Sequence, residues 1–224
     1  MEAIDEHFLR VVGGRDARSV SPRPDSYDGT LRRMFDAQAR SRHLDFAARW
    51  LQSEGEGHYT IGSAGHESNA ALGLLSRIDD PALLHYRSGG FYVARAALAG
   101  STDAVRDVLA SLTSAASDPI SGGRHKVFGH PALNIVPQTS TIASHLPRAV
   151  GLGYALDLGR AVGVVPPWPP DAVVLCSFGD ASANHSTAAG ALNAAAYLRH
   201  RGIPCPVLFV CEDNGIGIST RSPS

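Results

Sequence analysis

The sequence has no long hydrophobic run, no CxxC motif and no marked excess of one charge. No apolar stretch approaches the ~18 residues that a helix needs to span a bilayer, so we expect no membrane contact. The three cysteines form no CxxC pair, which favours core thiols in a reducing compartment. The formal net charge of −1 provides no field that would attract nucleic acid. Because the charged N-terminus also lacks an apolar signal region, we predict a cytoplasmic location.

Several catalytic motifs are missing as well. The sequence has no phosphate-binding P-loop, no GxSxG nucleophile elbow, no complete GxGxxG and no HExxH pair of zinc ligands. It does have 44% hydrophobic and 18% charged residues, as in a globular protein with a buried core. A chain of 224 residues is long enough for one large α/β domain.

Two apolar runs that end in polar residues are the most informative feature. Residues 173–179 lead into Asp180, and residues 207–212 lead into Asp213 and Asn214. Both runs have the composition of buried strands. Because open α/β sheets bind ligands at the carboxyl edge of their strands, Asp180 and Asn214 are predicted to share a site there. A carboxylate and an amide oxygen suit a hard cation such as Mg²⁺, which usually also takes phosphate oxygens from a cofactor.

The remainder of the sequence alternates between helical and strand patterns. Residues 31–52 carry apolar side chains at helical spacing, and a loop rich in Gly and Pro is expected over residues 117–139. Strands that alternate with helices predict an α/β fold with a doubly wound parallel sheet. The further helices are expected over residues 66–76, 91–100, 102–115, 146–163 and 187–201.

The two ends of the chain are expected to differ from its middle. Residues 1–29 mix charge, Gly and Pro, and we interpret them as an irregular arm before an α/β domain over residues 30–224. A doubly wound sheet needs strands beyond the last apolar run, so we expect the domain to be truncated at its C-terminus. We also expect Ser101 or Thr102 to be the N-cap of the helix over residues 102–115, and Gly202 to end the helix over residues 187–201.

The two strand-end segments resemble the thiamine diphosphate motif of thiamine-dependent enzymes. CEDNGIGIST is similar to a segment of the alpha subunit of 2-oxo acid dehydrogenases, the first component of the multienzyme complexes. The resemblance implies a thiamine diphosphate-binding fold. It makes Asp180, Asn214 and the backbone carbonyl of Ile216 the Mg²⁺ ligands. It also makes the backbone around Ala181 and Ser182 a diphosphate contact.

The resemblance extends to five other positions. HYRSGG resembles the segment in which Tyr86 and Arg87 would contact the diphosphate. In TSTIASHLP, Ile142 would offer backbone groups to the aminopyrimidine ring, and Ser140 matches a position near a bound monovalent cation. Tyr59, in YTIGSAGHES, falls where the branched-chain enzymes of bacteria place an aromatic residue in the substrate pocket.

Two residues depart from the family pattern. The family has a Gly-Asp-Gly triplet here, and Ala181 replaces the Gly at its third position. An Ala would be strained there if its φ were positive. Asp213 replaces an Asn and adds negative charge near the diphosphate. We expect His66 and Glu67 to be structural, because capping and packing explain them without chemistry.

The resemblance implies oxidative decarboxylation of a 2-oxo acid, with acyl transfer to lipoamide. The cofactors would be thiamine diphosphate and Mg²⁺, and the closest type would be the branched-chain dehydrogenase. No catalytic residue is expected in this chain, because the family supplies a Glu from a beta subunit or a fused second half. The isolated chain is therefore expected to be inactive.

The expected partners are that second half, in a dimer or heterotetramer, and a lipoyl-bearing acyltransferase. The alternatives are a pyruvate or acetoin dehydrogenase of the same build, and a non-catalytic scaffold remnant of the fold.

Overall fold

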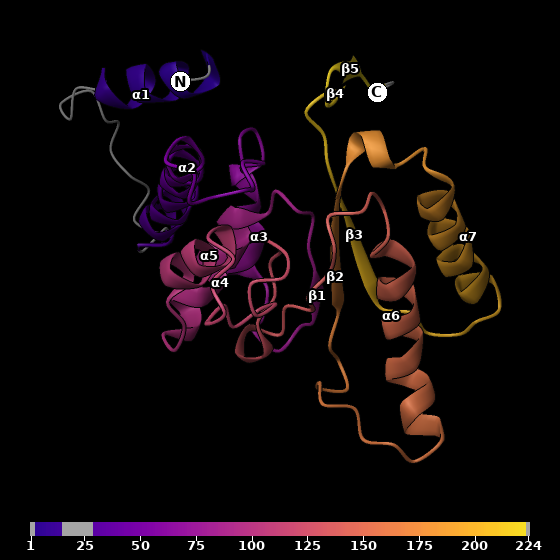
Figure 1. Cartoon of the computed structure of the whole chain (residues 1–224). Coiled ribbons are helices and arrows are strands. Elements are labelled where there is room, and N and C mark those ends of the chain that lie inside the picture. The colour runs from indigo at the N-terminus through magenta and orange to yellow at the C-terminus, as the bar shows by residue number, and fades with distance from the viewer. Residues whose placement is uncertain (1–2, 15–28, 223–224) are drawn as a thin grey trace.

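A parallel sheet with helices on both sides forms the centre of the molecule (Figure 1). The structure is a computed structural model that describes residues 3–14 and 29–222. The sheet has the order β1-β2-β3, with β1 at Ala82–Leu83, β2 at Val174–Gly179 and β3 at Val207–Glu212. Both strand pairs are parallel, which confirms the predicted α/β fold.

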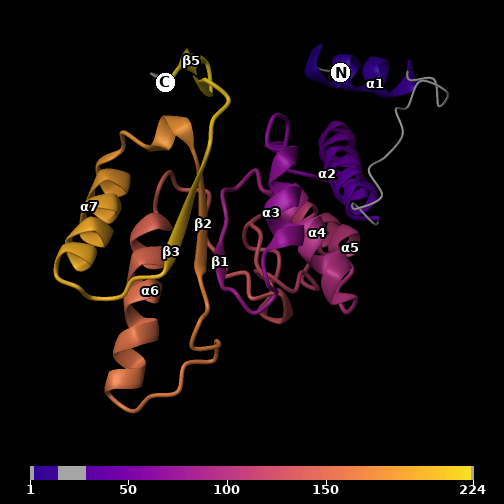
Figure 2. The ribbon, with the colours of Figure 1, turned by 180° about the vertical axis from the view of Figure 1, so that it is seen from behind.

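Alternate residues of the strands pack against different helices. Leu175 belongs to a core cluster with α2, α4 and α5, whereas its neighbours Val174 and Cys176 belong to a cluster with α6 and α7. Figure 2 shows the same arrangement from behind, with α6 and α7 on one side of the strands and α2 to α5 on the other. The helices are α1 (Ala3–Gly13), α2 (Thr30–Ser53), α3 (Ala70–Leu75), α4 (Gly89–Ala99), α5 (Ala104–Leu112), α6 (Leu146–Ala161) and α7 (Ser186–His200).

The register of the strands aligns their carboxyl ends. Gly179 of β2 pairs with Glu212 of β3, so the residues that follow each strand leave the sheet at one edge. β1 leads to the same edge, because the N–H of His85 donates to Ser177 Oγ at 2.9 Å. Three chain segments far apart in sequence therefore meet where the cofactor motif was predicted.

The predicted helices are present, with two corrections at their starts. The N-cap of α5 is Asp103, not Ser101 or Thr102, because the Asp103 carboxylate accepts from the Arg106 N–H at 3.1 Å. The helix expected over residues 66–76 begins as a 3₁₀ turn at Glu67–Asn69, and only α3 is α-helical. Gly202 follows α7 at φ 68°, as predicted for a helix end. Within the described residues, every helix is too short or too polar to cross a bilayer.

The prediction of an irregular arm is wrong for residues 3–13, which form α1. The buried carboxylate of Asp5 pairs with the buried guanidinium of Arg42 on α2. Phe8 adds its ring at 5.7 Å from the same guanidinium. A tertiary ion pair thus holds α1 where composition alone suggested no structure, and residues 15–28 of the predicted arm lie outside the described residues.

Candidate functional site

A cleft of about 280 Å³ opens at the carboxyl edge of the sheet. All the predicted site residues except Tyr59 and Ser140 line it. Those that do are Tyr86, Arg87, Ile142, Asp180, Ala181, Ser182, Asn214 and Ile216. The sequence-based expectation that Asp180 and Asn214 share one site therefore agrees with the geometry.

Asp180 begins the 3₁₀ turn Asp180–Ser182 that directly follows β2. Its carboxylate accepts a hydrogen bond from the Ser222 hydroxyl. Partial burial would raise the pKa of Asp180, but the hydrogen bonds from Ser222 and from the backbone of Ala181 and Asn214 outweigh it and lower that pKa. The carboxylate is therefore ionised at neutral pH.

Neither departure from the family pattern closes the cleft. Ala181 lies within the right-handed 3₁₀ turn, so the strain expected from a positive φ does not arise. The Asp213 carboxylate is turned to the backbone, where it accepts from the Gly215 N–H at 2.8 Å, and Asp213 does not line the cleft. Gly215 supplies the positive φ of this turn, 72°.

Arg87 and Tyr86 face the cleft from the loop after β1. The Arg87 guanidinium lies 5.4 Å from the centre of the Tyr86 ring and donates to the Gly62 carbonyl at 2.7 Å. Both side chains are half-buried. One hydrogen bond leaves other N–H groups of the guanidinium fork for an anionic ligand, such as a phosphate.

Tyr59 and Ser140 form a separate group with His125. The Ser140 N–H donates to His125 Nε2 at 3.2 Å, and the Tyr59 ring lies edge-on to His125 with 6.3 Å between ring centres. Burial raises the pKa of Tyr59, with Tyr86 and Arg87 acting on it as neighbouring charges. The two predicted residues outside the cleft lining are therefore close to residues of the cleft.

The structure adds a buried polar cluster below Asn214 that sequence reasoning did not assign to the site. His66 Nδ1 lies 2.8 Å from Glu212 Oε2, and Asn69 donates to the same oxygen at 3.2 Å. The Ser88 hydroxyl donates to Glu212 Oε1 at 3.1 Å. Burial would raise the pKa of Glu212, but the hydrogen bond from His66 and the nearby histidines lower it.

His66 and His85 both line the cleft, so our interpretation of His66 as purely structural was incomplete. Burial lowers the pKa of His85 to about 3, which makes it neutral at physiological pH. One signal for this cluster was present in the sequence. Glu212 is the last residue of the strand that leads to Asn214, at the edge where ligands bind.

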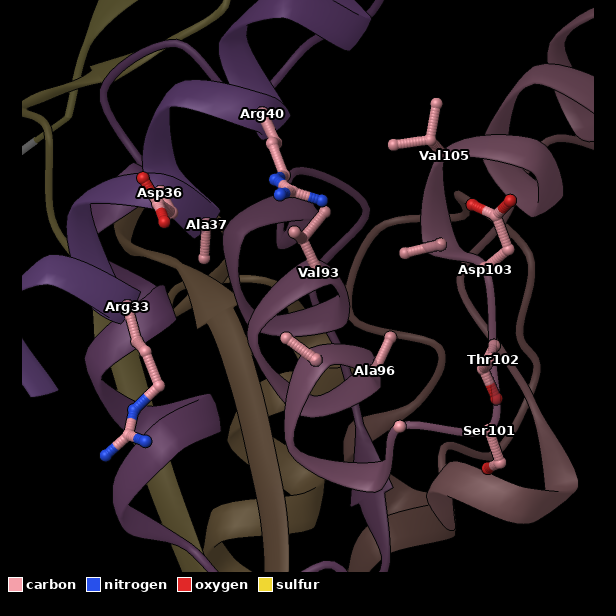
Figure 3. A pocket seen from close by; sticks show the side chains of 13 residues that line it. Arg33, Asp36, Ala37, Arg40, Val93, Ala96, Ser101, Thr102, Asp103 and Val105 are labelled. Atoms are coloured by element: carbon pink, nitrogen blue, oxygen red, sulfur yellow. The ribbon is translucent and has the colours of Figure 1, made fainter. Parts of the chain in front are cut away.

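A larger pocket, of about 470 Å³, lies elsewhere, between α2, α4 and the start of α5 (Figure 3). Figure 3 shows Arg33 and Arg40 on α2, with Asp103 on the α5 side. None of the predicted site residues lines it, and it lies away from the strand ends. The smaller cleft is therefore the candidate site.

The donor groups of the cleft fit a magnesium diphosphate. Asp180 contributes an ionised carboxylate and Asn214 an amide oxygen, and Ile216, which has a backbone carbonyl, lines the same space. All three offer oxygen ligands, which Mg²⁺ prefers. Arg87 adds a cation for the phosphate oxygens that such an ion would share.

Comparison with known proteins agrees with this geometry. The family model described as "Dehydrogenase E1 component" matches residues 36–224, which include the whole cleft. This chain belongs to the dehydrogenase E1 component family. The resemblance read from the cofactor motif is thereby confirmed at the level of the family.

Similar proteins are mitochondrial alpha subunits of 2-oxoisovalerate dehydrogenase. This E1-family chain is 32% identical to the mouse protein over 105 residues, 46% of the chain. It is 36% identical to the alpha 2 subunit of Arabidopsis thaliana over 93 residues, 42% of the chain. It is 26% identical to the Caenorhabditis elegans protein over 209 residues, 92% of the chain. The alignments cover 21%, 17% and 44% of these relatives, so the chain spans less than half of their length.

Proposed function

We propose that this E1-family chain anchors the diphosphate of thiamine diphosphate, through Mg²⁺, in a 2-oxo acid dehydrogenase. One observation carries the proposal. Asp180 and Asn214, which follow neighbouring parallel strands, line one cleft together with Arg87. Hard oxygen ligands and a planar cation are what a magnesium diphosphate requires.

In this proposal the metal ligands are the Asp180 carboxylate, the side-chain oxygen of Asn214 and the Ile216 carbonyl. Arg87 and Tyr86 bind the diphosphate from the opposite segment of the cleft. The backbone of Ala181 and Ser182 adds contacts at the start of the 3₁₀ turn. These assignments are supported by the shared cleft lining.

Three further residues have proposed roles toward the rest of the cofactor and the substrate. Ile142 offers its backbone to the aminopyrimidine ring, and Ser140 lies near a monovalent cation. Tyr59 forms part of the substrate pocket. The half-buried position of Tyr59 beside His125 supports this role, because it leaves an aromatic wall close to Arg87.

Thiamine diphosphate, when bound, supplies a carbanion-stabilising centre for decarboxylation. The reaction we propose is oxidative decarboxylation of a 2-oxo acid, with the acyl group passed to lipoamide on an acyltransferase partner. This chain binds and orients the cofactor, whereas the catalytic Glu comes from a beta subunit or a fused second half. We therefore expect a dimer or heterotetramer, and no turnover by the chain alone.

The names of the relatives favour a branched-chain 2-oxo acid over pyruvate or acetoin as the substrate. The local geometry favours an enzyme over a scaffold remnant, because Ala181 is unstrained and Asp213 is turned away from the cleft. A cytoplasmic location stays a prediction.

Calorimetry with thiamine diphosphate and Mg²⁺, with the partner half supplied, tests the proposal. Asp180→Ala should weaken metal-dependent binding by more than about 100-fold, since even outer-shell partners of a metal are worth 10- to 100-fold. Asp213→Asn, which keeps an acceptor for the Gly215 N–H, is the matched control and should bind as the parent does. Absence of metal-dependent binding in the assembled parent would favour the scaffold, and parent-like binding by Asp180→Ala would reject Asp180 as a ligand.

A further inference from the structure

The side chain of Asn214 has two ends of similar shape and opposite chemistry, and only its oxygen can bind a cation. In the structure Oδ1 accepts from the Ile216 N–H at 3.2 Å, an Asx-type turn that the NH₂ group could not make. A carbonyl-type oxygen has two lone pairs, so this bond leaves one free. The NH₂ end must then point elsewhere, and its surroundings decide how firmly the amide is held.

The NH₂ end meets His66. Asn214 Nδ2 lies 3.3 Å from His66 Nε2, so the amide donates and the imidazole accepts. The side chain of His66 is 3% exposed. Gly65 brings the chain close beneath Asn214 at φ +83°, and a Cβ at that glycine would lie 3.9 Å from Asn214 Nδ2. The turn before α3 is thus built to place an imidazole under the amide.

Glu212 decides which nitrogen of His66 carries the proton. His66 Nδ1 lies 2.8 Å from Glu212 Oε2, and a carboxylate can only accept. The proton of the neutral ring therefore resides on Nδ1, which leaves Nε2 as an acceptor. Asn69 and Ser88 hold the same carboxylate in place.

We infer that His66 is a positioning residue, which together with Glu212 locks the amide of Asn214 so that its oxygen faces the cation site. A flipped amide would set NH₂ against the Ile216 N–H and oxygen against the lone pair of His66, two repulsive contacts. The chain of hydrogen bonds therefore selects the ligating orientation before any cation arrives. This inference deepens the proposed function and rests on it.

Cation affinity is the first test, measured with Mn²⁺ and thiamine diphosphate on the chain assembled with its partner half. His66→Leu removes both hydrogen bonds and should weaken Mn²⁺ binding by about 10- to 100-fold, the usual effect of an outer-shell partner. His66→Gln keeps one donor and one acceptor and should recover most of that loss. The control is His145→Leu, which removes an equally buried histidine, 3% exposed, that bonds the Ser177 carbonyl and does not line the cleft.

The control should lower the melting temperature but leave Mn²⁺ affinity unchanged. Parent-like affinity in His66→Leu would overturn the inference, as would an equal loss in His66→Leu and His145→Leu. A failure of the parent itself to bind Mn²⁺ with thiamine diphosphate would instead count against the proposed function. The two failures are therefore distinguishable.

The second test needs no cofactor. In ¹H–¹⁵N spectra of the full chain, the side-chain NH₂ of Asn214, assigned with Asn214→Asp, should shift in His66→Leu and stay near its parent position in His145→Leu. An unchanged signal in His66→Leu would overturn the inference.

A third test addresses a different occupant of the cluster, a metal ion. His66, His85 and Glu212 bring their ligand atoms within 4.8 Å of one another, and His85 Nδ1 has no hydrogen-bond partner among the described residues. Zn²⁺ alone is expected not to bind tightly there. Tight Zn²⁺ binding that His85→Asn removes would make the cluster a metal site and would overturn the positioning role.

Discussion

Asp180 and Asn214, the two side chains proposed as metal ligands, follow the ends of β2 and β3, yet the chain supports them in different ways. Every residue of β2 is buried, so Asp180 continues from a strand fixed by packing on both faces. β3 is an edge strand of the described sheet, and Leu208 within it is 45% exposed. Asn214 instead depends on the polar cluster formed by Glu212 and His66. The difference teaches that an inner strand can position a ligand by packing, whereas an edge strand needs hydrogen bonds to do so.

Truncating one apolar side chain in each strand should produce the largest difference, a difference in the free energy of unfolding. Phe178 in β2 is 4% exposed and packs in the α6–α7 core cluster. Phe178→Ala should therefore lower the free energy of unfolding by about 3–5 kcal/mol. Leu208→Ala in β3 should cost less than about 1 kcal/mol, because much of that side chain is already in water. Urea unfolding followed by circular dichroism measures both, and equal losses would contradict the comparison.

His85, which follows β1, should make the free energy of unfolding depend on pH. The buried His85 has a pKa of about 3, against 6.5 for an ordinary histidine, so only the unfolded chain takes up this proton in mild acid. The free energy of unfolding should therefore be retained above pH 6.5 and fall progressively below it, by about 2 kcal/mol at pH 5 from this residue alone.

Unfolding of the parent and of His85→Leu, measured between pH 7.5 and 5, checks this sign. Because Nδ1 of His85 has no hydrogen-bond partner among the described residues, an apolar replacement should be tolerated. The variant should have the flatter profile. Parallel profiles for the two proteins would contradict the expectation.

Ser222 should have the smallest effect. Its hydroxyl occupies one lone pair of the Asp180 carboxylate and lowers the pKa of that group. Ser222→Ala should cost about 1 kcal/mol or less in stability, the usual worth of one partly exposed hydrogen bond. It should also raise Mn²⁺ affinity slightly, since the freed lone pair can face the cation. The exposed Ser219→Ala is the control, and weaker Mn²⁺ binding in Ser222→Ala alone would show that the hydroxyl supports the site rather than competes for it.

Local patterns predicted most of the fold. Apolar residues at helical spacing gave α2 at Thr30–Ser53, and the run before Asp180 gave β2. The prediction was wrong for α1, because its helix is held by the Asp5–Arg42 pair, a contact between residues distant in sequence. The cap of α5 was misplaced for a simpler reason. Three capping residues in a row, Ser101, Thr102 and Asp103, offer the same chemistry, and only backbone geometry selects Asp103.

The candidate site likewise contains residues that the sequence predicted and residues that it did not. Asp180 and Asn214 could be predicted because parallel strands deliver their ends to a common edge, and that rule depends only on order along the chain. The role of His66 could not be predicted, because no pattern in the sequence around it indicates a contact with Asn214.

By itself, the sequence determined the family, the α/β fold and the two strand ends that would meet, since each is encoded in short-range periodicity or in a contiguous motif. Only the tertiary structure decided that Glu212, His66 and Asn214 form one chain of hydrogen bonds. The physical reason is that such bonds require distances near 3 Å between groups far apart in sequence, and only packing of the whole domain sets those distances.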